Sequence, residues 1–102
     1  MAKFELPIYN AETGEIAKTY KRDFMPTGLY IRFLKLSEKL VGSELKTDAE
    51  LFELLKDLMC ETFSEMTEDE YYNNTDVQAV LKVWSAILSK SATIEGGKSK
   101  NA

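Results

Sequence analysis

The sequence contains no histidine, the side chain that most often serves as a general base and as a transition-metal ligand. Its single cysteine, Cys60, can form neither a disulfide within the chain nor a structural zinc site. No glycine-rich phosphate loop follows a strand pattern, because Gly96, Gly97 and Lys98 have no helix pattern after them. These absences argue against an enzyme, and we expect no catalytic residue, no cofactor and no metal.

Long apolar runs are also missing. No stretch approaches the roughly 18 apolar residues of a membrane span, and the first ten residues lack the apolar core of a signal peptide. With 13 basic and 17 acidic residues the formal net charge is -4, which argues against nucleic acid as the main partner. Cys60 lies among apolar residues, so it reads as a small buried hydrophobe, with a reactive thiol as the alternative. A reducing compartment without membrane contact fits these features.

The remaining composition, 44% hydrophobic and 29% charged over 102 residues, is typical of one globular domain. The helix and strand patterns extend through residues 1–91. From Ala92 the sequence becomes small, polar and glycine-bearing, which predicts a flexible C-terminal tail over 92–102. The fold class expected is α+β and mainly helical, with an N-terminal β-hairpin packed against three main helices and a short connecting helix.

The hairpin is predicted from alternation in "FELPI", followed by "YNAETG" and "EIAKTYK". Asn10 and Gly14 supply turn chemistry, and Gly14 can adopt positive φ. Pro7 lacks an N–H, so its strand should lie at an edge or leave that position unpaired. An exposed hairpin edge would permit strand addition or self-association.

The helices are predicted from apolar spacing and from caps. Pro26 precedes a face formed by Leu29, Phe33, Leu36 and Leu40, which Gly42 should end. Three later segments each open with a capping-box pattern, in which a threonine is followed three residues later by Glu or Gln. These patterns are Thr47 with Glu50, Thr67 with Glu70, and Thr75 with Gln78.

The stretch "TFSEMTEDEYYNNTD", Thr62 to Asp76, holds five acids and could be a metal loop, a docking surface or a connection between helices. A calcium loop starting at Asp69 would place Tyr71 at its third position and Asn74 where a glycine is needed, so that reading fails. Caps and turn residues explain most of the stretch. Tyr71 and Tyr72 are less fully explained, since one should pack inward and the other should be exposed.

Candidate protein-binding residues are therefore few. Tyr71 and Tyr72 are the first, with core packing as the alternative. Trp84 is another, although it lies on the apolar face of its predicted helix and also fits the core. Lys21 and Arg22 form a second candidate patch, which could equally be a solvated strand end.

The segment "CETFSEMTEDEYYNNTDVQAVLKVW" resembles the most characteristic stretch of the tail assembly chaperones of long non-contractile-tailed phages. "TYKRDFMPTGLYIRFLKLSEKL" is similar to the start of that family, and the likeness covers roughly Tyr20 to Leu88. The matching positions in the first segment are Phe63, Thr67, Glu68, Asp69, Tyr71, Asp76, Val80 and Leu81. "NNTD" departs from the family, where a glycine is common in this turn.

The resemblance implies a non-enzymatic chaperone that binds the tape measure protein and helps recruit tail tube subunits during tail morphogenesis. It implies action in the host cell cytoplasm and absence from the mature virion. A programmed frameshift near Gly97 and Lys98 would yield a short and a long form, with this chain as the short one. The rival readings are a small phage regulator that binds a host protein through its acidic surface, a helical nucleic-acid binder, and an enzyme.

Overall fold

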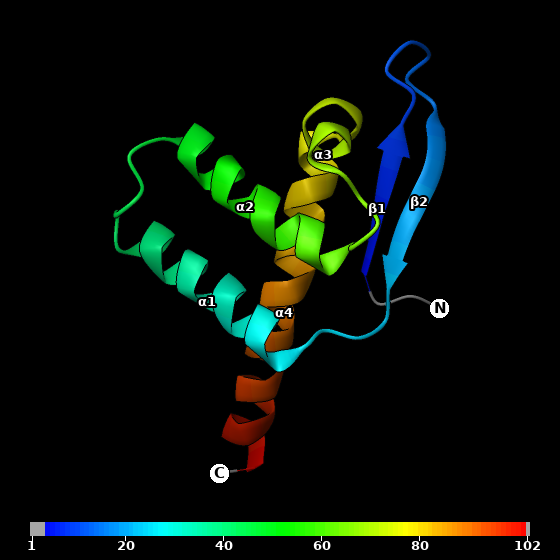
Figure 1. Cartoon of the computed structure of the whole chain (residues 1–102). Helices are drawn as coiled ribbons and strands as arrows, with labels where there is room; N and C mark the ends of the chain where they lie inside the picture. Colours follow the sequence, from blue (N-terminus) through cyan, green and yellow to red (C-terminus); the bar gives the residue numbers. More distant parts are fainter. Residues whose placement is uncertain (1–3, 102) are drawn as a thin grey trace.

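A computed structural model describes the backbone of residues 4–101 and the side chains of residues 4–89. A two-stranded antiparallel hairpin stands beside a group of four helices, which confirms the α+β, mainly helical fold class (Figure 1). The flexible tail predicted for residues 92–102 falls outside the fully described residues and stays a prediction. The elements are β1 (Phe4–Tyr9), β2 (Ile16–Arg22), α1 (Thr27–Val41), α2 (Asp48–Thr62), α3 (Glu68–Asn74) and α4 (Val77–Asn101).

The hairpin follows the alternation of its sequence. Phe4, Leu6 and Ile8 of β1 are buried, because successive side chains of a strand point to opposite faces and this face meets the helices. The turn is built as predicted: the Asn10 side chain accepts hydrogen bonds from two backbone N–H groups beyond it, and Gly14 has φ of 75°. One hairpin face is thereby fixed toward the core.

Both hairpin strands are edges in the described part of the chain, as Pro7 predicted. β2 carries one extra residue near the turn, since Ile8 pairs with Lys18 whereas Tyr9 pairs with Ile16. The backbone carbonyl of Tyr9, at the end of β1, accepts a hydrogen bond from Asn74 Nδ2 at 2.9 Å. A side chain of α3 is therefore bonded to the end of β1.

Helix α1 begins after Pro26 and buries Leu29, Phe33 and Leu36, as its spacing predicted. Leu40, the fourth residue of that predicted face, is 43% exposed. The helix ends at Gly42 as expected, but Gly42 has φ of -78° and Ser43 takes the left-handed conformation with φ of 59°. Backbone bonds from Ser43 to Leu40 and from Glu44 to Lys39 complete a Schellman motif around a serine.

Two of the three predicted caps are correct. Thr47 Oγ1 accepts from the backbone N–H of Glu50, and Thr67 forms both bonds of a capping box with Glu70. The prediction that Thr75 caps the last helix is wrong. Its hydroxyl donates back to the carbonyl of Tyr71 in α3, and a carboxylate oxygen of Asp76 accepts from the N–H of Gln78 instead.

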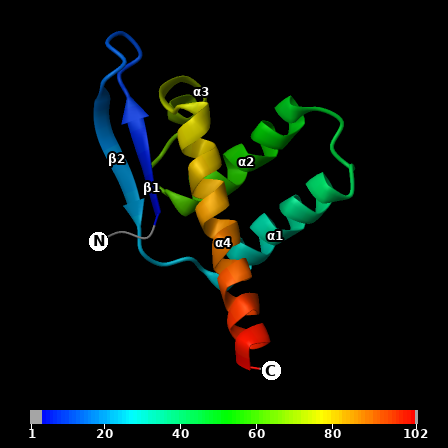
Figure 2. The ribbon, with the colours of Figure 1, turned by 180° about the vertical axis from the view of Figure 1, so that it is seen from behind.

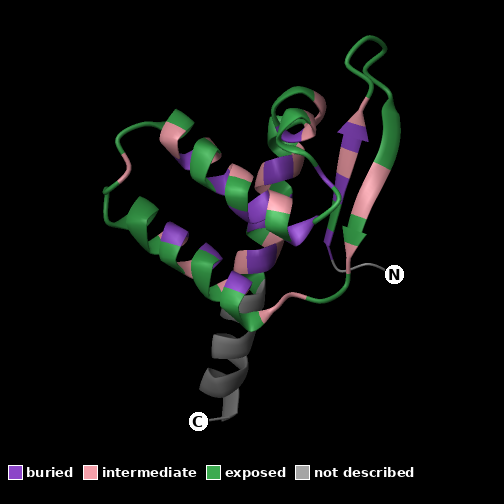
Figure 3. Ribbon diagram, viewed as in Figure 1, coloured by how far each residue is buried: buried purple, intermediate pink, exposed green. Residues whose placement is uncertain are grey.

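The core lies where the hairpin face, α1, α2 and α3 meet α4 (Figures 2 and 3). Helix α4 contacts both β1 and α1, so one helix supports the sheet and the helical layer together. Strand β1 and all four helices contribute buried apolar side chains to this core, and the least exposed of them are Leu6, Phe33, Leu55, Met59 and Ile87. Burial of this continuous apolar surface is the main force that holds the hairpin on the helices.

Candidate functional site

The elbow, defined as residues 67–76, consists mainly of the short capped helix α3. The acids of α3 surround its first turn, where the partial positive charge of the helix N-terminus favours them. No group of three or more His, Cys, Asp or Glu side chains that could hold a metal occurs in the part of the chain with described side chains. The elbow must therefore be understood by its packing and its contacts.

Glu70 fastens the elbow to the hairpin. Its carboxylate accepts hydrogen bonds from the Tyr20 hydroxyl at 2.8 Å and from the Thr67 N–H at 3.1 Å, and it forms an ion pair with Lys18 at 3.0 Å. Partial burial acts to raise the pKa of Glu70, but the bonds from Lys18, Thr67 and Tyr20 outweigh it, so the pKa lies below its ordinary value of 4.5. The elbow and β2 are thus held in one fixed relation.

The two tyrosines of the elbow divide as the sequence predicted. Tyr71 is buried, and its hydroxyl donates to the backbone carbonyl of Phe52 in α2 at 2.8 Å. Burial raises the pKa of Tyr71, so the hydroxyl stays a neutral donor. Tyr72 is 53% exposed, and its ring meets the Tyr71 ring edge to face at a centroid distance of 5.3 Å.

An apolar hollow of about 330 Å³ lies beside these rings, between α2, α3 and the start of α4. We name it the aromatic hollow. Val77 at its margin is 50% exposed, so Tyr72 and Val77 together present apolar surface to solvent. The lining residues are Ala49, Phe52, Glu53, Tyr71, Tyr72, Thr75, Val77 and Val80.

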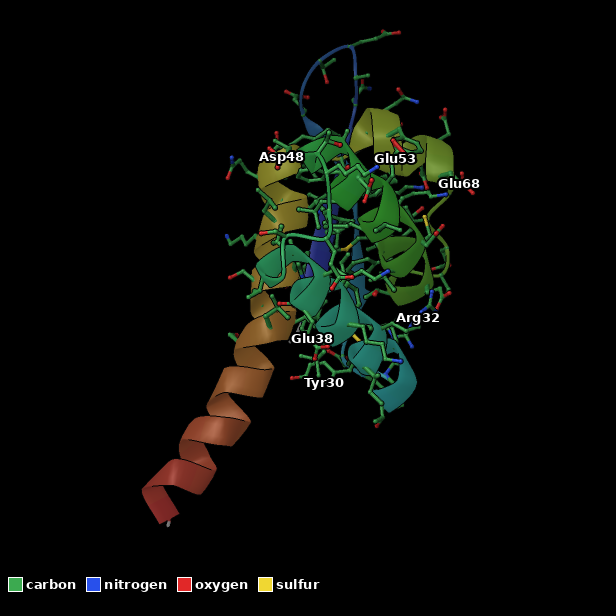
Figure 4. All side chains as sticks on the ribbon, turned by 90° about the vertical axis from the view of Figure 1, so that its left-hand side faces the viewer. Tyr30, Arg32, Glu38, Asp48, Glu53 and Glu68 are labelled. Atoms are coloured by element: carbon green, nitrogen blue, oxygen red, sulfur yellow. The ribbon has the colours of Figure 1, made fainter. Side chains whose placement is uncertain are left out.

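One acid, Glu53, lines the aromatic hollow, and Asp48 and Glu68 lie at the same end of the molecule (Figure 4). An apolar floor with a carboxylate beside it suits an apolar segment of another protein that carries a basic residue at its flank. The arrangement contains no nucleophile paired with a base, which an acyl-transfer or hydrolytic site would need.

Of the second predicted patch, Lys21 and Arg22, one residue already has a structural role. The Arg22 guanidinium donates to the carbonyls of Thr62 at 2.8 Å and Glu61 at 3.3 Å, which are last-turn acceptors of α2. A cation at a helix C-terminus satisfies unpaired carbonyls and opposes the helix dipole. Arg22 therefore anchors β2 to α2, and Lys21 alone is exposed.

The remaining candidates are in or near the core. Trp84 is 6% exposed, so its indole lies in the core of this chain. This is the alternative that the sequence offered to a protein-binding role. Trp84 does not line the aromatic hollow. Cys60 is half-buried, and desolvation raises the pKa of its thiol, which favours the unreactive protonated form. The structure brings together only Tyr71 and Tyr72 of the five predicted residues.

Two residues that line the aromatic hollow, Phe52 and Val77, were not predicted from the sequence as site residues. Phe52 lies next to the buried face of α2, which includes Leu51 and Leu55, but is not part of that face. An aromatic residue beside a buried helix face could have indicated a binding residue. Val77 opens α4 beside the aromatic hollow and is 50% exposed.

The fold is a small α+β domain, and the aromatic hollow, with Tyr72 and Val77 exposed beside it, is an apolar recess suited to another polypeptide. The sequence model of one family, described as phage tail chaperone protein, matches residues 1–102, and the chain belongs to that family. No curated protein and no solved structure matches the chain. Among the described residues, no helix is long and apolar enough to cross a membrane.

Proposed function

We propose that this chain is a non-enzymatic tail assembly chaperone that binds the tape measure protein through the aromatic hollow. Membership of the phage tail chaperone family supports the assembly role. The observation that carries the choice of surface is the paired exposure of Tyr72 and Val77 over an apolar recess. A long helical client has an apolar stripe before assembly, and a recess of this kind would cover part of it.

The rest of the elbow prepares this surface. Because Glu70 is bonded to Thr67, Lys18 and Tyr20, α3 is held before any client arrives, and less ordering entropy is lost on binding. The carboxylate of Glu53 favours a client segment with a basic residue beside its apolar stripe. The family match favours this role over that of a regulator that binds a host protein.

Recruitment of tail tube subunits is the second part of the proposed role. It rests on the family and on Lys21, the exposed basic residue beside the Arg22 anchor. A long form made by frameshifting near Gly97 and Lys98 would carry an additional segment for the tube protein. A slippery heptamer at those codons, with an overlapping downstream frame, is the observation that tests this form. Release of the chaperone in the host cytoplasm before the virion is complete belongs to the same proposal.

Co-expression with the tape measure protein tests the client surface. The native chain should keep the tape measure protein in the supernatant and copurify with it. Tyr72→Ala should lower the copurified amount by about tenfold, the effect of losing an aromatic contact residue that contributes about 1.4 kcal/mol or more. Tyr72 is exposed and makes no described hydrogen bond, so the variant should fold as the native chain does.

Ile16→Ala is the matched control, because Ile16 is a 57% exposed apolar residue on the hairpin, outside the aromatic hollow. This variant should keep full client binding. A tape measure protein that remains equally insoluble with and without the native chain contradicts the chaperone role. Client binding that is unaffected by Tyr72→Ala contradicts the assignment of the aromatic hollow.

A further inference from the structure

A second surface, separate from the aromatic hollow, lies between α1 and α2. It is a groove of about 220 Å³, which we name the charged groove. Leu36 and Leu58 form its floor and are nearly buried, whereas Leu54 is 37% exposed. The two helices run antiparallel side by side, joined by the loop that follows the Schellman motif (Figure 1).

The two walls of the charged groove carry opposite charges. On α1, Arg32, Lys35 and Lys39 line the groove at spacings of three and four residues, which places them on one stripe. On α2, Asp57 lines the groove, and Glu50 and Glu61 lie on the same stripe at helical spacing. One helix therefore presents a basic row, and its antiparallel neighbour presents an acidic row.

Contacts within the chain use only part of this charge. Arg32 pairs with Glu61 across one end of the groove, and Asp57 pairs with Lys56 of its own helix at 3.0 Å. Lys35, Lys39 and Glu50 have no ion pair among the residues whose side chains are described. Unpaired charges of both signs, on either side of an exposed leucine, remain available to a partner.

A surface with one basic and one acidic helix is complementary to itself. Consider a two-fold axis that lies in the interface and runs parallel to the helices. A half turn of one copy about this axis places its α1 against α2 of the other copy. Because the Arg32–Glu61 pair fixes the relative height of the helices, Lys35 then lies level with Asp57 of the second copy, and Lys39 lies about one helical turn from its Glu50. The two helix pairs then form a four-helix bundle, in which every helix is antiparallel to both of its neighbours.

We propose that the charged groove is a self-association surface on which a second copy of this chain docks in an isologous two-fold dimer. The occupant follows from charge: a purely acidic or purely basic helix would match one wall and be repelled by the other. The interface joins exposed ion pairs around Leu54, so the dimer is weak and loosens as salt rises. It is independent of the proposed client surface, since the aromatic hollow shares no lining residue with the charged groove.

Sedimentation equilibrium of the purified full chain, over a wide range of protein concentration at low salt, tests the dimer. We expect a concentration-dependent monomer–dimer equilibrium. Lys35→Glu with Lys39→Glu should raise the dissociation constant by about tenfold or more, because like charges then face each other. Lys82→Glu is the charge-reversal control, since Lys82 is exposed on α4 outside the charged groove, and it should leave the equilibrium unchanged.

A charge exchange separates specific pairing from a general charge effect. The acidic row is reversed in a second variant, Glu50→Lys with Asp57→Lys, which should also dissociate when alone. Mixing the two variants should restore a dimer, because each basic row then meets an acidic row across both halves of the interface. A chain that stays monomeric throughout, a dimer insensitive to both double variants, or a mixture that stays dissociated would each overturn the proposal.

Discussion

The elbow and the α1–α2 pair are held together in different ways. The elbow is fixed by specific polar contacts: Glu70 binds Lys18 and Tyr20, Tyr71 donates to the Phe52 carbonyl, and Asn74 donates to β1. Between α1 and α2, the polar contact among the residues with described side chains is the exposed Arg32–Glu61 pair, and buried apolar side chains provide the remaining contact.

This difference indicates where binding specificity can reside. A recess that is fixed by hydrogen bonds keeps its shape and can select a client by fit, which suits the aromatic hollow. A face whose charges are largely unused inside the chain selects a partner by charge pattern, which suits the charged groove. Three stability measurements test whether polar contacts contribute more to the free energy of unfolding in the elbow than between α1 and α2.

The largest effect should come from Tyr71. Tyr71→Ala removes a buried ring and should lower the free energy of unfolding by about 3–5 kcal/mol, the range for truncation of large aromatic residues. Tyr71→Phe keeps the ring and loses only the bond to Phe52, so it should cost about 1 kcal/mol. Urea unfolding gives both values, and Tyr72→Phe on the exposed neighbour is the control. If Tyr71→Phe costs nothing, the hydroxyl contact does not fix the elbow.

An intermediate effect should come from Glu70. Glu70→Gln keeps the shape of the side chain but removes its charge, and it should cost about 1–2 kcal/mol near neutral pH, where charged hydrogen bonds are lost. Because the pKa of Glu70 is lowered in the folded state, the carboxylate stabilises the fold above the pKa of the unfolded chain, and this contribution is lost as pH falls through the folded pKa. The gap between native chain and variant should therefore narrow below about pH 4.

Asp69→Asn is the control for Glu70, because Asp69 is an exposed acid of the same short helix and bonds only to Asn73. Asp69→Asn should cost less stability near neutral pH than Glu70→Gln, because Asp69 makes no contact with the hairpin in the described part of the chain. A Glu70→Gln gap that stays constant from neutral to acid pH would contradict the ionic role of Glu70 in fastening the hairpin.

The smallest effect should come from the Arg32–Glu61 pair. Both side chains are about half exposed, so solvent screens their attraction, and a double-mutant cycle should give a coupling free energy of about 0.2–0.5 kcal/mol. The cycle uses Arg32→Ala, Glu61→Ala and the double variant, at low protein concentration so that self-association does not contribute. A coupling free energy as large as the cost of Glu70→Gln would contradict the conclusion that polar contacts hold the elbow more strongly than they hold α1 and α2 together.

The sequence predicted most of the fold because local signals dominate there. Apolar periodicity identified the inner face of α1, and Asn10 with Gly14 specified the hairpin turn. The wrong cap occurred where two local signals compete, because Thr75 and Asp76 can both cap α4. The choice between them depends on tertiary position, which a pattern cannot resolve.

The candidate site was less predictable because its parts come from distant segments. The bond of Arg22 to the end of α2 and that of Tyr20 to Glu70 each join residues at least 40 positions apart. No spacing rule links such positions. The sequence could nominate Tyr71 and Tyr72 as an aromatic pair. Which of the two rings would be buried, and that Phe52 would line the aromatic hollow with them, depends on the packing of three helices.

Trp84 gives the chain an optical reporter of its own. It is the sole tryptophan, and its ring is shielded from water at the contact of α4 with the rest of the core. Emission from the folded chain should therefore lie at shorter wavelength than emission after denaturation. Every unfolding curve proposed above can be recorded on unlabelled protein, and none of the proposed substitutions introduces a second fluorophore of this kind.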